Sequence, residues 1–168
     1  MSAHEIERLD ERGMSAHERN GRKAEERRRS SSPIAPTAGQ YTARVLLVED
    51  DDQMRFLMRD VLVAGGYEVY EAADGARFAE YMEQTQEGRR PVPDLIISDI
   101  RMPGQSGLAV VDEIRRTDWA TPIIFVTAFG DRTTHEEGAR LGAVAVLNKP
   151  FELDELLDLA TSWVPPIL

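Results

Sequence analysis

Residues 45–66 read VLLVEDDDQMRFLMRDVLVAGG and hold a complete strand, turn and helix pattern. The apolar run 45–48 predicts a short strand that is buried on both faces. Apolar side chains then recur at helical spacing, at Met54, Leu57, Met58, Val61 and Leu62. Two glycines follow and end the pattern. The stretch therefore predicts a strand and an amphipathic helix, joined by the acidic residues 49–52.

The same alternation of short apolar runs and amphipathic segments continues along the chain. Further strands are predicted at residues 67–71, 95–98, 123–127 and 144–147, and further helices near residues 78–82, 110–114, 132–141 and 153–160. This order is typical of an α/β fold with a parallel sheet and helices on both faces. The segment 132–141 has little apolar stripe and contains Gly138, so we expect it to be the least stable helix.

Composition and charge limit the possible functions. The 168 residues include no cysteine, which excludes a disulfide framework and a thiol nucleophile. No apolar stretch reaches the length of a membrane span, and the first residues are too charged for a signal peptide, so we expect a cytoplasmic protein without membrane insertion. Residues 43–168 carry 12 basic and 23 acidic side chains. Such an acidic segment disfavours nucleic acid as a partner.

Residues 1–42 differ in composition from the rest of the chain. They carry 8 basic and 7 acidic side chains and few apolar ones. Because so little apolar surface cannot offset the loss of chain entropy, we predict a disordered charged tail. The folded domain is then expected at residues 43–164, followed by a short end at residues 165–168.

Polar residues follow the predicted strands where ligands bind in open α/β sheets. Glu49 and Asp50 follow the first strand, Asp99 the third and Thr127 the fourth. Carboxylates from neighbouring strand ends repel one another unless a cation lies between them, and their oxygens suit Mg²⁺. Lys149 follows the fifth strand and is the single lysine among residues 43–168, beside 11 arginines. A compact ammonium on a flexible stem suits contact with a phosphoryl oxygen or a carboxylate.

Four motifs in fixed order give the domain a family resemblance. They are VLLVEDD, DIRMPGQSG beginning at Asp99, PIIFVTA and LNKPF. Residues 43–164 resemble the receiver domain of bacterial two-component response regulators, similar to the chemotaxis regulator. The resemblance implies a flavodoxin-like, doubly wound sheet of five parallel strands in the order 2-1-3-4-5. The sequence ends at Leu168, just past the last predicted helix, so we expect no output domain after the receiver domain.

The resemblance implies a role for each polar residue at the strand ends. Asp99 would be the phosphoacceptor, which attacks a phosphohistidine as a carboxylate nucleophile. Asp50 would bind Mg²⁺ directly and Glu49 through water, with Asp99 and the main-chain carbonyl of Arg101 completing the set. Lys149 would neutralise the transferred phosphoryl oxygens, and Thr127 would hydrogen-bond to them.

Three positions concern switching and water access. Receivers usually carry Tyr or Phe three residues before the lysine, whereas this chain carries Val146, so the usual aromatic coupling to Thr127 is missing. Phe129 and Arg101 lie two residues after Thr127 and Asp99, at positions that flank the phosphoryl group. A bulky apolar residue at 129 is expected to slow hydrolysis.

These observations favour a single-domain response regulator, either a phosphorelay intermediate or a protein-binding switch. Its expected partners are a sensor histidine kinase or histidine phosphotransfer protein and a downstream protein target. An alternative is a phosphorylation-independent scaffold with the same fold, and a third is a Mg²⁺-dependent phosphatase of similar topology. The sequence offers no second acid after Asp99 for the phosphatase. His135 has no evident partner in the sequence and is assigned no role.

Overall fold

The computed structural model of the protein describes residues 42–118 and 120–167. The predicted tail, apart from Thr42, lies outside these residues, so its disorder and the domain boundary at 42–43 stay predictions. Within the described ranges, the helices are too short or too polar to cross a membrane.

One parallel sheet forms the centre of the domain, with its strands in the order β2-β1-β3-β4-β5. The strands are β1 (Arg44–Val48), β2 (Glu68–Ala72), β3 (Leu95–Asp99), β4 (Ile123–Thr127) and β5 (Ala145–Asn148). This order confirms the expected doubly wound, flavodoxin-like fold. The winding direction reverses between β1 and β3, which is where such sheets bind ligands.

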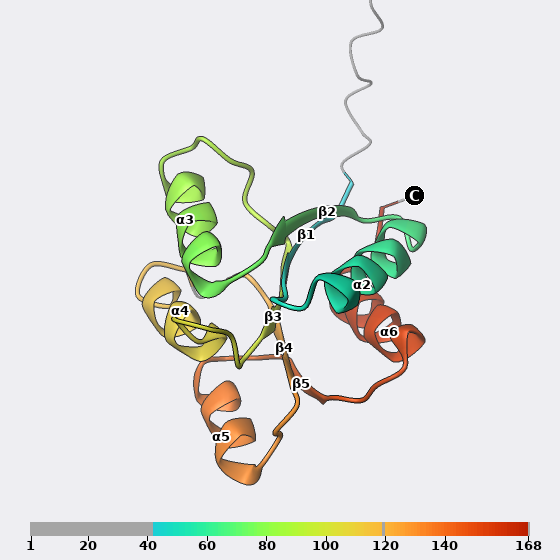
Figure 1. Ribbon diagram of the computed structural model, residues 1–168. Helices are drawn as coiled ribbons and strands as arrows, with labels where there is room; N and C mark the ends of the chain where they lie inside the picture. Colours follow the sequence, from blue (N-terminus) through green and yellow to red (C-terminus); the bar gives the residue numbers. More distant parts are fainter. Residues whose placement is uncertain (1–41, 119, 168) are drawn as a thin grey trace, which may run out of the picture. The chain divides into compact units, whose positions relative to one another are not determined.

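Five described helices cover the two faces of the sheet. They are α2 (Asp52–Ala64), α3 (Gly75–Gln86), α4 (Gly107–Ile114), α5 (Arg132–Arg140) and α6 (Leu153–Trp163). Figure 1 shows α2 and α6 on one face and α3, α4 and α5 on the other. Four of these helices begin at a side-chain cap, because Asp51, Asp74, Ser106 and Asp131 each accept a hydrogen bond from a first-turn N–H.

The core consists of two apolar layers, one on each face of the sheet. In β1, Leu46 and Val48 face one layer, and Val45 and Leu47 face the other. All four side chains are fully buried. The continuous apolar run therefore arises because both faces of the central strands are covered, as the sequence predicted.

The second strand begins one residue later than predicted. Tyr67 was expected to open it, but the N–H of Tyr67 donates to the carbonyl of Leu62 at 3.1 Å and so closes α2. The Tyr67 hydroxyl donates to the carbonyl of Val164 at 2.6 Å. Tyr67 thus joins the end of α2 to the end of α6, and β2 starts at Glu68.

Candidate functional site

The predicted site residues lie at the carboxyl ends of three adjacent strands and just after β5. Glu49 and Asp50 follow β1, Asp99 is the last residue of β3 and Thr127 the last of β4. Lys149 follows β5, and its N–H donates to the carbonyl of Thr127 at 2.8 Å. The parallel sheet therefore brings residues far apart in the sequence to one edge, as the strand pattern predicted.

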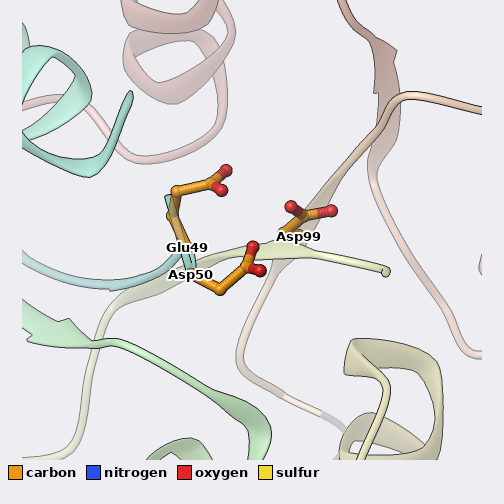
Figure 2. Close-up of side chains that lie close together, drawn as sticks. All are labelled: Glu49, Asp50 and Asp99. Atoms are coloured by element: carbon orange, nitrogen blue, oxygen red, sulfur yellow. The ribbon is translucent and has the colours of Figure 1, made fainter. Parts of the chain in front are cut away.

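Three carboxylates form a compact cluster at the point where the winding reverses. One oxygen from each of Glu49, Asp50 and Asp99 lies within 4.8 Å of the others. Figure 2 shows the side chains of Glu49 and Asp50 reaching from the end of β1 toward Asp99 on β3. Glu49 and Asp99 are buried, at 0% and 5% exposure. The donor atoms are all hard oxygens, which fits Mg²⁺ rather than a softer transition metal.

The ammonium of Lys149 joins two of these carboxylates. Its Nζ donates to Oε2 of Glu49 at 2.9 Å and to Oδ2 of Asp99 at 3.1 Å. The sequence predicted that Lys149 would reach a carboxylate or phosphoryl oxygen, and the structure brings it to Asp99. The direct pairing of Lys149 with Glu49 was not predicted, because the two residues are 100 positions apart.

Electrostatics at the cluster favour an added cation. Burial raises the pKa of Glu49 above its ordinary value, the charge of Asp99 raises it further, and the hydrogen bond from Lys149 only partly opposes this. Burial alone would lower the pKa of Lys149, but Glu49 and Asp99 outweigh it and raise that pKa. Lys149 therefore stays protonated. One ammonium faces three carboxylates, so negative charge remains uncompensated.

Thr127 is fully buried at the end of β4. Its Oγ1 accepts a hydrogen bond from the N–H of Phe129 at 3.1 Å. A hydroxyl that accepts one bond still carries its own proton and can donate it. The structure thus leaves Thr127 with a donor to offer at the carboxyl edge of the sheet.

Arg101 and Phe129 lie together beside the cluster. The guanidinium carbon of Arg101 stands 4.6 Å from the centre of the Phe129 ring, which is a cation–π contact. The main-chain N–H of Arg101 donates to Oδ1 of Asp99 at 3.2 Å. Phe129 is 61% exposed, so this pair forms an outer wall and not part of the core.

The backbone of Gly107 lies too close to Asp99 to carry a side chain. A Cβ added at Gly107 would lie 2.1 Å from the carbonyl oxygen of Asp99 and 2.7 Å from Oγ of Ser98. The Gly107 N–H donates to the carbonyl of Ile100 at 2.9 Å, and Ser98 donates to the Asp99 carbonyl. The start of α4 is therefore packed tightly against the end of β3, which fixes the position of Asp99.

Sequence reasoning missed two contacts near the carboxyl ends of the strands. Arg55 donates to the main-chain carbonyl of Glu49 at 2.9 Å and to Asp52 at 2.7 Å. The i, i+3 spacing of Asp52 and Arg55 was a signal for the second bond. His135 had no evident partner in the sequence. In the structure, the distance between its Nε2 and Oδ1 of Asn148 is 3.2 Å. No local pattern in the sequence indicates this contact between α5 and β5.

Val146 on β5 lies against α5. A Cβ added at Gly138 of α5 would come within 2.9 Å of Cγ2 of Val146. Gly138 is buried, which explains how a helix without an apolar stripe packs on the sheet. Its lack of a side chain allows the α5 backbone to approach β5 closely.

Comparisons with known proteins agree with this geometry. The sequence pattern of the response regulator receiver domain matches residues 45–161. Chemotaxis protein CheY of Bacillus subtilis is 35% identical over 117 residues, which cover 68% of this chain and 92% of CheY. Sporulation initiation phosphotransferase F of the same species is 28% identical over 122 residues, covering 73% of this chain and 94% of that protein.

A solved structure supports the same assignment. Response regulator protein TrrA of Thermotoga maritima, in complex with Mg²⁺ and BeF, is 30% identical with a TM-score of 0.63, covering 73% of this chain and 99% of TrrA. Longer relatives also match, and this chain spans only 23% and 26% of two of them. The fold, the strand-end cluster and these matches together show that the chain belongs to the response regulator receiver domain family, whose members are phosphoacceptors of two-component signalling.

Proposed function

We propose that this chain accepts a phosphoryl group on Asp99 from a sensor histidine kinase or a histidine phosphotransfer protein, in a Mg²⁺-dependent reaction. The observation that carries the proposal is the Lys149 ammonium, which lies within 3.1 Å of the buried Asp99 carboxylate and also holds Glu49. Lys149 has the place and the charge to meet an anionic group arriving at Asp99.

The proposed transfer needs little proton chemistry from the protein. An ionised oxygen of Asp99 attacks phosphorus, the P–O bond forms, and the P–N bond to the donor histidine breaks. The electron pair of that bond leaves with the imidazole, which is then protonated from solvent. Lys149 remains protonated throughout, because both of its carboxylate partners raise its pKa. The Thr127 hydroxyl would donate to one oxygen of the bound phosphoryl group.

The residues that would hold Mg²⁺ are Glu49, Asp50, Asp99 and the main-chain carbonyl of Arg101. The three carboxylates fit the ion, because they gather oxygen ligands in one place and carry more charge than Lys149 neutralises. When bound, Mg²⁺ would supply further positive charge to the phosphoryl oxygens. Glu49 would act through water, since its Oε2 already accepts from Lys149.

A protein donor is supported by the surface of α2. Phe56 and Leu57 are 54% and 48% exposed, and Val63 lies one heptad after Phe56 at 53% exposure. This helix begins directly after the acidic turn, and Phe56 and Leu57 lie in its first two turns. Exposed apolar side chains gathered on one helix are typical of a protein contact.

Two modes of action fit the proposal: a phosphorelay intermediate and a switch that binds a downstream protein. Sporulation initiation phosphotransferase F and CheY, which this chain matches over 94% and 92% of their lengths, support a single-domain regulator of either kind. The proposal includes a cytoplasmic location. A purely structural scaffold would gain nothing from the uncompensated charge of the cluster.

Phosphorylation by acetyl phosphate, followed by intact-mass measurement, tests the proposal. We expect one added phosphoryl group in the wild type with Mg²⁺ and none after chelation. Asp99→Asn should abolish the addition, whereas Asp158→Asn, at an exposed position of α6, should leave it unchanged. Lys149→Arg keeps the charge but should lose most of the rate, because a planar fork cannot replace the ammonium between two carboxylates. Addition that persists in Asp99→Asn would refute the assignment.

The lifetime of the phosphorylated form tests the roles of Arg101 and Phe129. We propose that their stacked side chains limit the access of water to the phosphoryl group. Phe129→Ala should shorten the lifetime without slowing phosphorylation to a similar degree. An unchanged lifetime would show that the pair does not shield the site.

A further inference from the structure

A groove separates α3 and α4 on the sheet face opposite α2 and α6. Its volume is about 670 Å³. The two helices are joined at both ends of the groove. At one end a Cβ on Gly75 would lie 2.1 Å from the carbonyl oxygen of Gln105, and at the other Nε2 of Gln86 donates to Oγ1 of Thr117 at 2.8 Å. Figure 1 shows the two helices side by side on this face.

Small side chains create the groove. On α3, Ala76 and Ala79 line the groove at a spacing of i, i+3. Met82, Val110 and Ile114 also line it and are no more than 5% exposed. Because a methyl group cannot fill the space to the opposite helix, a trough with apolar side chains in its lining remains between α3 and α4.

Carboxylates dominate the polar part of the lining. Glu80 and Glu83 come from α3 and Glu113 from α4. Arg116 is the one cationic residue that lines the groove among the described residues, and it lies 3.5 Å from Glu113. The groove therefore presents an apolar strip with a net negative border.

We propose that the α3–α4 groove binds an amphipathic helix of a partner protein, with basic residues flanking its apolar stripe. An apolar trough between two helices suits an apolar helix stripe, and the carboxylate border suits lysine or arginine beside it. The site goes beyond the proposed phosphoryl transfer and does not depend on it.

Charge favours a basic partner helix over the other possible occupants of the groove. A second copy would bring the same carboxylate border and a segment with 23 acidic against 12 basic side chains, so the two would repel each other. Nucleic acid and anionic membranes are repelled for the same reason. Because α2 lies on the opposite face, a helix in the groove would leave the proposed donor surface open.

The test is titration of the ¹⁵N-labelled full chain with synthetic helical peptides, followed by NMR. The probe is a peptide of about four helical turns with leucines at i, i+3, i+4 and i+7 and lysines elsewhere. A peptide of the same composition in scrambled order and one with glutamate in place of lysine are the comparisons. We expect binding of the basic amphipathic peptide alone, with shifts concentrated in the amides of α3 and α4.

Variants locate the binding. Ala79→Trp fills the trough and should weaken affinity roughly tenfold or more, whereas Ala139→Trp, at an exposed position of α5, should not. Glu83→Lys should also weaken binding, unlike Glu155→Lys on α6. The charge variant stands at a surface position and keeps the test decisive if the tryptophan variant folds poorly.

Three results would overturn the proposal. The first is equal binding of the scrambled peptide, which would show mere charge attraction. The second is a set of shifts outside α3 and α4 that neither Ala79→Trp nor Glu83→Lys reduces. The third is self-association in sedimentation that Ala79→Trp abolishes, because the groove would then be an interface between copies of this chain.

Discussion

The outer strand β5 is covered by α6 on one face and by α5 on the other, and the two helices are held in different ways. α6 places Leu156 and Ala160, both fully buried, in the apolar layer that it shares with α2. Within α5 only Gly138 is buried, and Leu141, directly after the helix, adds one apolar contact. The same edge of the sheet is therefore held by apolar side chains on one face and by backbone contact on the other.

A buried arginine compensates for the poor apolar packing of α5. Arg115, 3% exposed, donates from Nε to the carbonyl of Leu141 at 2.9 Å and from NH1 to the carbonyl of Thr121 at 2.9 Å. It thereby ties the end of α5 to the loop before β4. Hydrogen bonds depend on geometry more than apolar contacts do. We therefore expect a displacement of α5 to need less free energy than a displacement of α6.

The largest expected effect is on the α6 side. Leu156→Ala should lower the free energy of unfolding by about 2–5 kcal/mol, because it removes a fully buried side chain and leaves a cavity. Glu136→Ala on α5, whose side chain is 62% exposed, should change it by less than about 0.5 kcal/mol. Urea unfolding measures both. A loss below about 1 kcal/mol for Leu156→Ala would show that apolar side chains do not hold α6.

Arg115→Met should cost about 2–4 kcal/mol, because it leaves buried carbonyls without donors. The matched control is Arg116→Met, at a neighbouring position with 68% side-chain exposure, which should be nearly neutral. Hydrogen exchange of the Arg115 variant should rise most at the end of α5. If exchange rose equally in α6, the arginine would be a general core residue and not the anchor of α5.

The effect of Gly138→Ala on stability should change sign when Val146 is also replaced. In the wild type the added Cβ meets Cγ2 of Val146 at 2.9 Å, and a β-branched side chain cannot turn away easily, so we expect a loss of about 1 kcal/mol. In the Val146→Ala background the contact is gone, and the higher helix propensity of alanine should stabilise by up to about 1 kcal/mol. Thermal or urea unfolding of the four proteins forms the cycle. The same sign in both backgrounds would show that close approach does not explain Gly138.

These anchors mark the limit of prediction from the sequence. The strands and the α2 helix follow from local periodicity, which lies within a few neighbouring residues. The convergence of Asp50, Asp99 and Lys149 also followed, because parallel strands end at one edge. Individual tertiary contacts did not follow.

The contacts that escaped prediction join residues without a shared local pattern. Gly138 reads as a weak position in a poor helix, and only the close approach of Val146 gives it a role. Arg115 reads as one more surface arginine, and its burial depends on carbonyls of two later segments. Such contacts depend on the packing of the whole domain and leave no trace in periodicity or spacing.

A smaller, pH-dependent effect concerns the loop that Arg115 holds. Burial alone would raise the pKa of Asp118, but hydrogen bonds from Thr121 and from the N–H of Ala120 outweigh it and lower that pKa below 3.8. An acid with a lowered native pKa adds stability above its unfolded value and loses it as the pH falls through the native value. The destabilisation caused by Asp118→Asn should therefore be full at pH 6 and shrink below about pH 4. Urea unfolding across this range measures it, and a constant difference would show that ionised Asp118 is not what secures the loop.

The last prediction concerns phosphorylation itself and compares the two helices directly. Thr127 ends β4, and the loop that follows it leads through Phe129 into α5, so a group bound at Asp99 and Thr127 would act first on that segment. Because Val146 supplies no aromatic ring, the response must pass through this loop and its weakly held helix. Adding beryllofluoride and Mg²⁺ should produce the largest change in amide exchange in residues 128–142, with α6 nearly unchanged. Asp99→Asn, treated in the same way, is the control and should show no change. Identical exchange of residues 128–142 in both states would exclude α5 as the responding element and favour a chain that only passes its phosphoryl group on.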